Sequence, residues 1–201
     1  MSEADGEARA EVRAPAKLNL GLRIAGVRAD GYHLLESVFV PVDLADELTL
    51  EWAPADAARV ELRVDGGPPG LERDDRNLAV RAALAFLAAA GLAREVRIAL
   101  KKRIPVGAGM GGGSSDAGAV LRAHAARFPG HVPASRLAAL ALSLGADVPY
   151  FLDPLPALMA GIGERIEPLA GFPALPILLA TPEPPLGTAE GFHAWDARHL
   201  P

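Results

Sequence analysis

The sequence predicts an α+β fold, on three observations. Apolar and polar residues alternate over 17–24 with the two-residue period of a strand, and this period returns over 48–52, 60–64 and 96–100. Residues 77–90 are instead rich in alanine and apolar on most sides, which is typical of a buried helix. The strands come in hairpin-like pairs rather than in regular alternation with helices. This order favours α+β over a doubly wound parallel sheet.

Local patterns bound the individual elements. Residues 1–10 are polar and acidic, and we expect a disordered tail there. Asn77 is a good N-cap and Gly91 a good terminator, so they bound the first helix. Gly145 likewise ends a helix that begins at Ser135. The other expected elements are a strand over 37–44, a hairpin of 48–52 with 60–64, a loop over 66–75, a helix over 114–128, and strands over 159–169 and 177–180.

Composition excludes several classes of function. The chain has 201 residues, 50% of them hydrophobic, which is enough for one compact core. A net charge of −5 leaves no broad basic surface for nucleic acid or for an anionic membrane. There is no cysteine, so disulfides and thiolate chemistry are absent. No apolar run approaches the roughly 20 residues that cross a bilayer, and the acidic N-terminus is unlike a secretory signal. We therefore expect a cytoplasmic protein.

A glycine-rich segment carries the strongest chemical signal. Five of the seven residues from Gly107 to Gly113 are glycine, and they lie between a predicted strand and a predicted helix. Without Cβ atoms the backbone N–H groups of such a loop can converge on one anion, and the helix start adds a partial positive charge. A tight turn with a serine cap at Ser114 or Ser115 is the plain alternative, but it does not need five glycines. The pattern therefore predicts a phosphate site.

Three common phosphate loops fit this segment poorly. A P-loop ends in Gly-Lys-Ser/Thr, which is absent here. Gly107, Gly109 and Gly112 have dinucleotide-loop spacing, but no Asp or Glu lies between Asp116 and Asp147 to hold a ribose. The later metal-binding motifs of protein kinases are also absent.

Several other residues have an ordinary structural interpretation on the sequence alone. Asp147 fits a turn, Lys17 a solvated strand edge, and Tyr32 and His33 a half-buried strand. The charged run Lys101–Arg103 is interpreted as a solvated strand end. The histidines without metal-ligand spacing are interpreted as surface residues; these are His124, His131, His193 and His199.

The segment Pro105–Ala117 resembles the phosphate loop of the GHMP kinases. Within them, Pro15–Leu20, Arg28–His33, Leu144–Pro149 and Gly161–Glu164 resemble the family that phosphorylates 4-diphosphocytidyl-2-C-methyl-D-erythritol. The resemblance implies a GHMP kinase N-terminal ATP-binding domain over 11–165, with a ribosomal protein S5 domain 2-like fold. Family members continue into a further α/β half, so residues 166–201 are expected to be the truncated start of a C-terminal domain.

The resemblance also implies roles for individual residues. Lys17 and Asp147 would be catalytic, with Asp147 acting on the attacking hydroxyl and Lys17 pairing with it and with the phosphoryl group. The residues implied to bind ATP are Pro105, Val106, Gly107, Ala108, Gly109, Met110, Gly111, Gly112, Gly113, Ser114, Ser115 and Asn77. Those implied to bind the substrate are Asn19, Tyr32, His33, Ile162 and Phe192, with Tyr32 stacking on the cytosine and His33 hydrogen-bonding to it.

The implied reaction is phosphorylation of a tertiary hydroxyl by ATP, supplied with Mg²⁺, in the non-mevalonate route to isoprenoids. The partners are then ATP and a cytidine diphosphate derivative, with no nucleic acid, no membrane and no metal site built by the protein. The sequence does not predict an oligomeric state. Two alternatives stay open: a GHMP kinase for another small alcohol, such as mevalonate or homoserine, and a truncated nucleotide-binding remnant without activity.

Overall fold

The computed structural model describes residues 6–27, 33–72, 74–161, 163, 165–180 and 197. Within these ranges, strands and helices follow one another in the mixed order that the sequence predicts. The elements are β1 (Ala8–Val27), β2 (His33–Pro54), β3 (Arg59–Asp65), α1 (Leu78–Ala90), β4 (Arg94–Lys101), α2 (Gly112–Arg127), α3 (Ala134–Leu144), the 3₁₀ turn η2 (Tyr150–Leu152), β5 (Ala157–Gly161) and β6 (Arg165–Pro168).

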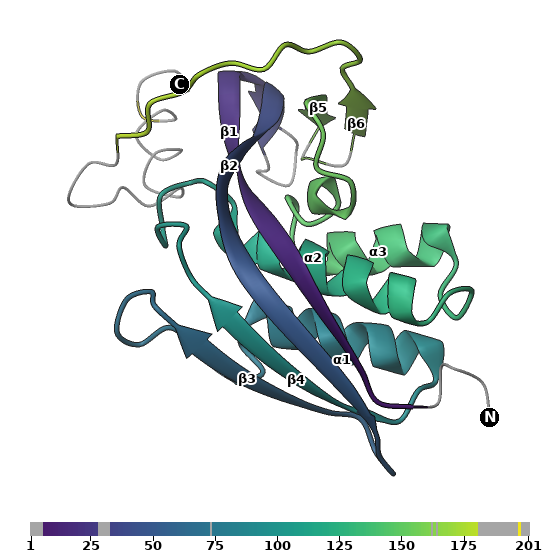
Figure 1. The fold of residues 1–201 in the computed structure, drawn as a ribbon. Helices are drawn as coiled ribbons and strands as arrows, with labels where there is room; N and C mark the ends of the chain where they lie inside the picture. The colour runs from purple at the N-terminus through teal and green to yellow at the C-terminus, as the bar shows by residue number, and fades with distance from the viewer. Residues whose placement is uncertain are drawn as a thin grey trace.

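The long strand β2 organises the sheet. It pairs antiparallel with β1 on one edge, and on the other edge with β4 over 47–54 and with β5 over 35–39. The strand order is β3-β4-β2-β5-β6, with β1 beside β2. Helices α1, α2 and α3 lie together on one side of this sheet (Figure 1). The predicted hairpin of 48–52 with 60–64 is wrong, because β4 lies between the two strands and β3 pairs with it in parallel.

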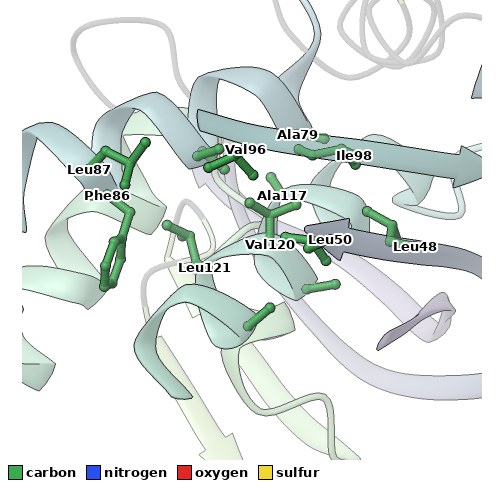
Figure 2. Packing of buried hydrophobic residues seen from close by; sticks show 14 of the residues in the cluster. Leu48, Leu50, Ala79, Phe86, Leu87, Val96, Ile98, Ala117, Val120 and Leu121 are labelled. Carbon is green, nitrogen blue, oxygen red and sulfur yellow. The ribbon is translucent and has the colours of Figure 1, made fainter. Parts of the chain in front are cut away.

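The main core lies between the sheet and the helices (Figure 2). The strands contribute alternate residues, such as Leu48 and Leu50 of β2 and Val96 and Ile98 of β4. Helix α1 contributes buried side chains that lie one helical turn apart, such as Ala79, Ala83 and Leu87. The glycines and alanines of α2 let that helix pack closely against α1. Burying a leucine or phenylalanine here stabilises the fold by about 1.5–3 kcal/mol. His124 also lies in this core and is fully buried, so its prediction as a surface residue is wrong.

The opposite face of the sheet carries charge rather than apolar residues. The strand register aligns two rows that alternate in sign across β1, β2, β4 and β3. The rows are Arg9–Glu51–Arg97–Glu61 and Arg13–Glu47–Lys101–Asp65. Opposite charges directly across a strand pair stabilise a sheet modestly. This part of the sheet is therefore a solvated surface, whereas the helical side buries the core.

Several boundaries differ from those predicted. Residues 8–10, predicted as part of the tail, belong to β1. The predicted strands over 37–44 and 48–52 are one continuous strand, and residues 177–180 form none. Strand β6 crosses the predicted domain boundary at 165/166 and pairs with β5, while the division into domains stays a prediction. The cap of α1 is confirmed: Asn77 Oδ1 accepts from the Ala79 N–H at 2.9 Å, and Gly91 ends the helix in the left-handed conformation. Among the described helices, none is long and apolar enough to cross a membrane.

Candidate active site

The glycine-rich loop leads from β4 into α2 and turns sharply. Gly107, Gly109 and Gly111 have φ values of 81°, 71° and 70°, a conformation that side chains with a Cβ rarely adopt. Gly111 is the N-cap of α2 and makes no side-chain capping bond. The first N–H groups of α2 therefore have neither a helical partner nor a side-chain cap, as an anion site at a helix start requires.

The loop separates two clefts. The larger, about 650 Å³, lies between the loop, β1 and the turn after α3, and contains Lys17, Asn19 and Asp147. The smaller, about 220 Å³, lies between the loop and the start of α1 and contains Asn77. The residues shared by both clefts include Gly107, Gly109 and Gly111. A phosphate chain held by the loop would therefore have one cleft on each side.

The two predicted catalytic residues meet in the larger cleft. Lys17 comes from β1 and Asp147 from the turn between α3 and η2, 130 positions further along the chain. The Lys17 Nζ lies 3.7 Å from Oδ2 of Asp147. The lysine side chain is only 7% exposed, whereas the aspartate is 33% exposed and accessible from the cleft. The carboxyl group of Asp147 can therefore contact a ligand in the cleft, while the buried ammonium group of Lys17 lies beside it.

Lys17 is held in place by several groups around it. Its Nζ donates to Oδ1 of Asn19 at 2.7 Å and lies 4.5 Å from the ring centroid of Phe39. Its backbone N–H donates to the carbonyl of Met110 in the glycine-rich loop at 3.0 Å. Burial lowers the pKa of Lys17, and the nearby carboxylate of Asp147 partly offsets that effect. A negatively charged phosphate group entering the cleft would favour the charged lysine further.

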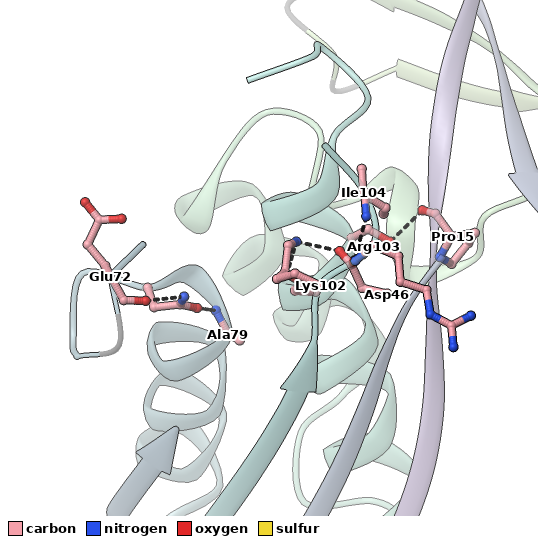
Figure 3. A network of polar contacts seen from close by, with 10 residues as sticks. Pro15, Asp46, Glu72, Ala79, Lys102, Arg103 and Ile104 are labelled. Carbon is pink, nitrogen blue, oxygen red and sulfur yellow. Dashed lines mark hydrogen bonds and ion pairs between the residues drawn. The ribbon is translucent and has the colours of Figure 1, made fainter. Parts of the chain in front are cut away.

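A buried ionic cluster lies behind the loop (Figure 3). Lys102 Nζ donates to Oδ2 of Asp46 and, at 2.8 Å, to Oδ2 of Asp116. The three side chains are at most 4% exposed. Asp46 also accepts from the backbone N–H groups of Arg103 and Ile104, at 2.5 and 2.9 Å. The cluster thus joins β2, the end of β4 and the first turns of α2, which are the segments that frame the loop.

The charges of this cluster are strongly coupled. Burial raises the pKa of Asp116 to about 7; Lys102 opposes this rise and Asp46 adds to it. Burial disfavours the Lys102 cation, but Asp116 and Asp46 together outweigh that effect and raise its pKa. The prediction that Lys102 lies at a solvated strand end is therefore wrong. Sequence reasoning missed Asp46 and Asp116; the signal that was available is that two of the chain's only three lysines directly precede the loop.

The other predicted site residues fall into three groups. Pro105, Val106, Ala108 and Met110 line the smaller cleft with the glycines, and Ser114 lines the larger one. Asn77 also lines the smaller cleft. Its amide donates to the Glu72 carbonyl and its oxygen caps α1. Ser115 differs, because its hydroxyl is fully buried and donates to the Pro15 carbonyl at 2.7 Å rather than facing a cleft.

The remaining predicted residues belong to the substrate side. Tyr32, Ile162 and Phe192 lie outside the described residues, as does the side chain of His33. The backbone of His33 begins β2 and pairs with Val27. Their predicted contacts with a cytosine stay predictions. Within the described ranges, no cluster of three or more His, Cys, Asp or Glu side chains is placed to hold a metal ion.

Comparison with known proteins agrees with this geometry. Residues 77–155 match the family model of the GHMP kinases N-terminal domain. A crystal structure of homoserine kinase from Cytophaga hutchinsonii, 22% identical, shares the fold with a TM-score of 0.51 over 72% of this chain and 42% of that one. The fold and the loop thus define a GHMP kinase N-terminal domain, and the chain belongs to the GHMP kinase superfamily.

Two further comparisons narrow the relationship. The chain is 49% identical to a 4-diphosphocytidyl-2-C-methyl-D-erythritol kinase of Deinococcus radiodurans, over 83% of its own length and 54% of the relative's. It is also 49% identical to the chain in a crystal structure of a 4-(cytidine 5'-diphospho)-2C-methyl-D-erythritol kinase, with a TM-score of 0.67 over 80% of this chain and 55% of that one. The resemblance to this group of kinases is confirmed. The chain spans about half the length of these relatives.

Proposed function

We propose that this chain forms the phosphate-binding half of a kinase that transfers the γ-phosphoryl group of ATP to the tertiary hydroxyl of 4-diphosphocytidyl-2-C-methyl-D-erythritol. The observation that supports this most is the Lys17–Asp147 pair, 3.7 Å apart in a cleft that the glycine-rich loop also lines. The groups proposed to activate the acceptor and those proposed to bind phosphate thereby line one space of about 650 Å³.

In the proposed reaction, each group has one task. The N–H groups of the loop and of the first turn of α2 hold the phosphates of ATP, which arrives with Mg²⁺. Asp147 accepts the proton of the hydroxyl as its oxygen bonds to the γ-phosphorus and the bond to the ADP oxygen breaks. Lys17 lies beside the carboxyl group of Asp147 and stabilises charge on the phosphoryl oxygens. Positioning and electrostatic stabilisation of this kind are what phosphoryl transfer mainly needs.

The proposed acceptor rests on the named relatives. Those at 49% identity are named as kinases of the cytidine-linked erythritol, whereas the homoserine kinase at 22% shares only the fold. We propose that Asn19, next to Lys17, contacts the erythritol end and that Tyr32, His33, Ile162 and Phe192 hold the cytidine end. The pathway, the cytoplasmic location and the use of Mg²⁺ are part of the same proposal.

The test compares four proteins in a phosphoryl-transfer assay: the parent, Asp147→Asn, Lys17→Met and the variant with both substitutions. Because the chain spans half of its relatives, each is made both as given and joined to the C-terminal part of the Deinococcus radiodurans relative. We expect turnover on the cytidine substrate to exceed turnover on mevalonate or homoserine by orders of magnitude. Asp147→Asn should lower turnover by about 10²–10⁴-fold with little change in binding. Losses from the two substitutions should not add, since the residues act as a unit.

Turnover on each substrate, together with a titration of ATP binding, separates this proposal from the alternatives. Comparable turnover on mevalonate would retain the superfamily and reject the substrate. ATP binding without transfer by any joined protein would favour a non-catalytic remnant. Full activity of Asp147→Asn would remove Asp147 from the mechanism.

A further inference from the structure

Arg122 on α2 connects the two segments that carry Lys17 and Asp147. One of its terminal nitrogens, Nη1, donates to the carbonyl of Phe151, four residues after Asp147. The other, Nη2, donates to the carbonyl of Arg13, four residues before Lys17, at 3.0 Å. One guanidinium group therefore binds both the turn that carries the carboxylate and the strand that carries the ammonium group.

Gly118 explains how the turn comes within reach of this arginine. It precedes Arg122 by one helical turn, so both lie on the same face of α2. A Cβ added at Gly118 would lie 2.5 Å from the Cβ of Phe151 and 2.8 Å from its carbonyl oxygen. Only a glycine permits the turn to pack so closely on the helix. The Phe151 carbonyl is thereby brought to the guanidinium group of Arg122.

The same turn reaches the glycine-rich loop through the ring of Phe151. A Cβ added at Gly111 would lie 3.0 Å from this ring and 3.3 Å from Cγ of Lys17. Phe151 is fully buried, so the ring has little freedom to move away. A displacement of the turn would therefore change the position of Asp147 relative to both Lys17 and the loop.

The electrostatics of Arg122 do not suit a purely stabilising role. Burial lowers its pKa, Asp153 partly offsets this effect, and the two acceptors it binds are neutral carbonyls. Taking a cation partly out of water costs free energy that packed apolar residues would not cost. What the guanidinium group adds is geometry, since its planar fork of donors binds two acceptors in fixed directions.

From these contacts we infer that Arg122 is a positioning residue that sets the separation between Lys17 and Asp147 by bridging the Arg13 and Phe151 carbonyls. The inference rests on the proposed function for its consequence in catalysis. Its physical content, the coupling between Lys17 and Asp147, is measurable without turnover.

The test uses the Lys17 titration as the readout. The chain has three lysines, so the side-chain nitrogen resonances are few and can be assigned by substitution. Replacing Asp147 by Asn removes a nearby negative charge and should lower the pKa of Lys17. We expect this decrease to be at least halved when it is measured in Arg122→Met or in Arg122→Gln, whose single amide is too short to bridge both carbonyls. In joined proteins that transfer phosphate, the same variants should lower kcat and leave the KM for ATP nearly unchanged.

Arg127→Met is the matched control. Arg127 lies on the same helix and also donates to a backbone carbonyl, that of Gly6 at 3.0 Å, far from both reacting groups in the sequence. It should leave the Lys17–Asp147 coupling unchanged. An unreduced coupling in folded Arg122→Met or Arg122→Gln would overturn the inference.

If neither variant folds, the parent protein decides. If Arg122 bridges the two carbonyls, its Nη–H resonances should be separate and exchange slowly. Averaged resonances from a freely rotating guanidinium group would overturn the inference. Absence of phosphoryl transfer by the joined parent would reject the proposed function, while the lysine titration would still decide the role of Arg122.

Discussion

Removing the cation of the buried cluster behind the loop should destabilise the protein strongly. In Lys102→Met, Asp46 and Asp116 would share a site that is at most 4% exposed without any opposite charge between them. Loss of one partner from a buried ionic network costs about 3–5 kcal/mol. Asp46 retains two backbone N–H donors, but Asp116 already has one oxygen, Oδ1, with no partner. We therefore expect a loss near the upper end of this range, out of the 5–15 kcal/mol of a typical domain.

The loss should also depend on pH in a defined direction. Burial already raises the pKa of Asp116 to about 7, and removal of Lys102 would raise it further. A carboxyl that binds its proton more tightly in the folded than in the unfolded state stabilises the fold at low pH, and this stabilisation is lost as pH rises through the folded-state pKa. Lys102→Met should therefore be more stable near pH 5 than near pH 8.

Urea unfolding at both pH values measures these effects. Lys101→Met is the matched control, because it removes the same charge one residue away on the exposed face of β4. It should cost less than about 1 kcal/mol at either pH. Equal losses for Lys101→Met and Lys102→Met, or a Lys102→Met loss that does not change with pH, would refute the electrostatic account of the cluster.

Three further predictions concern the loop, the core and the charged face. Gly112→Val should weaken ATP binding at least about tenfold in a titration, because its side chain would block the close approach of phosphate to the N–H groups of the loop, and its Cβ, 3.1 Å from the side chain of Ile104, would require only a local shift there. Burial lowers the pKa of His124 to about 4, so unfolding measurements should show up to roughly 3 kcal/mol of stability lost as pH falls from about 6.5 towards 4, and His124→Phe should flatten this slope. Arg97→Ala, which removes the charge opposite Glu51, should cost about 0.2–1 kcal/mol at low salt and less at about 1 M salt.

Local patterns in the sequence predicted the local structure well. Asn77 and Gly91 bound α1 because a side-chain acceptor and a left-handed glycine are needed at those two places whatever the tertiary structure. The glycine-rich segment was predicted to lie between a strand and a helix, and the structure has it between β4 and α2. The loop as a phosphate site, and Lys17 and Asp147 as partners, came from chemistry and from resemblance. No periodicity could have shown that residues 130 positions apart meet.

Burial of polar residues could not be predicted from the sequence. Lys102 looks like the end of a solvated strand until the structure places two carboxylates against it. His124 lies on an alanine-rich helix, and its Nδ1 bonds to the Val120 carbonyl, which satisfies one nitrogen without any distant partner. Strand pairing was missed for a related reason. A two-residue period shows which face of β3 is buried and says nothing of its neighbour, which is β4 rather than β2.

The glycine-rich loop needs external support to act as a phosphate site. Glycine loses more conformational freedom on folding than any other residue, so five of them cannot fix the loop by themselves. The structure surrounds them with rigid contacts: Phe151 and Lys17 lie against Gly111, and Ile104 lies against Gly112. The Ser115 hydroxyl was predicted to bind ATP, but it is buried and donates to the carbonyl of Pro15, two residues before Lys17. This bond joins α2 to β1. Because Phe151 and Lys17 belong to the segments that carry the two reacting groups, ordering the loop and holding the distance between Lys17 and Asp147 depend in part on the same contacts.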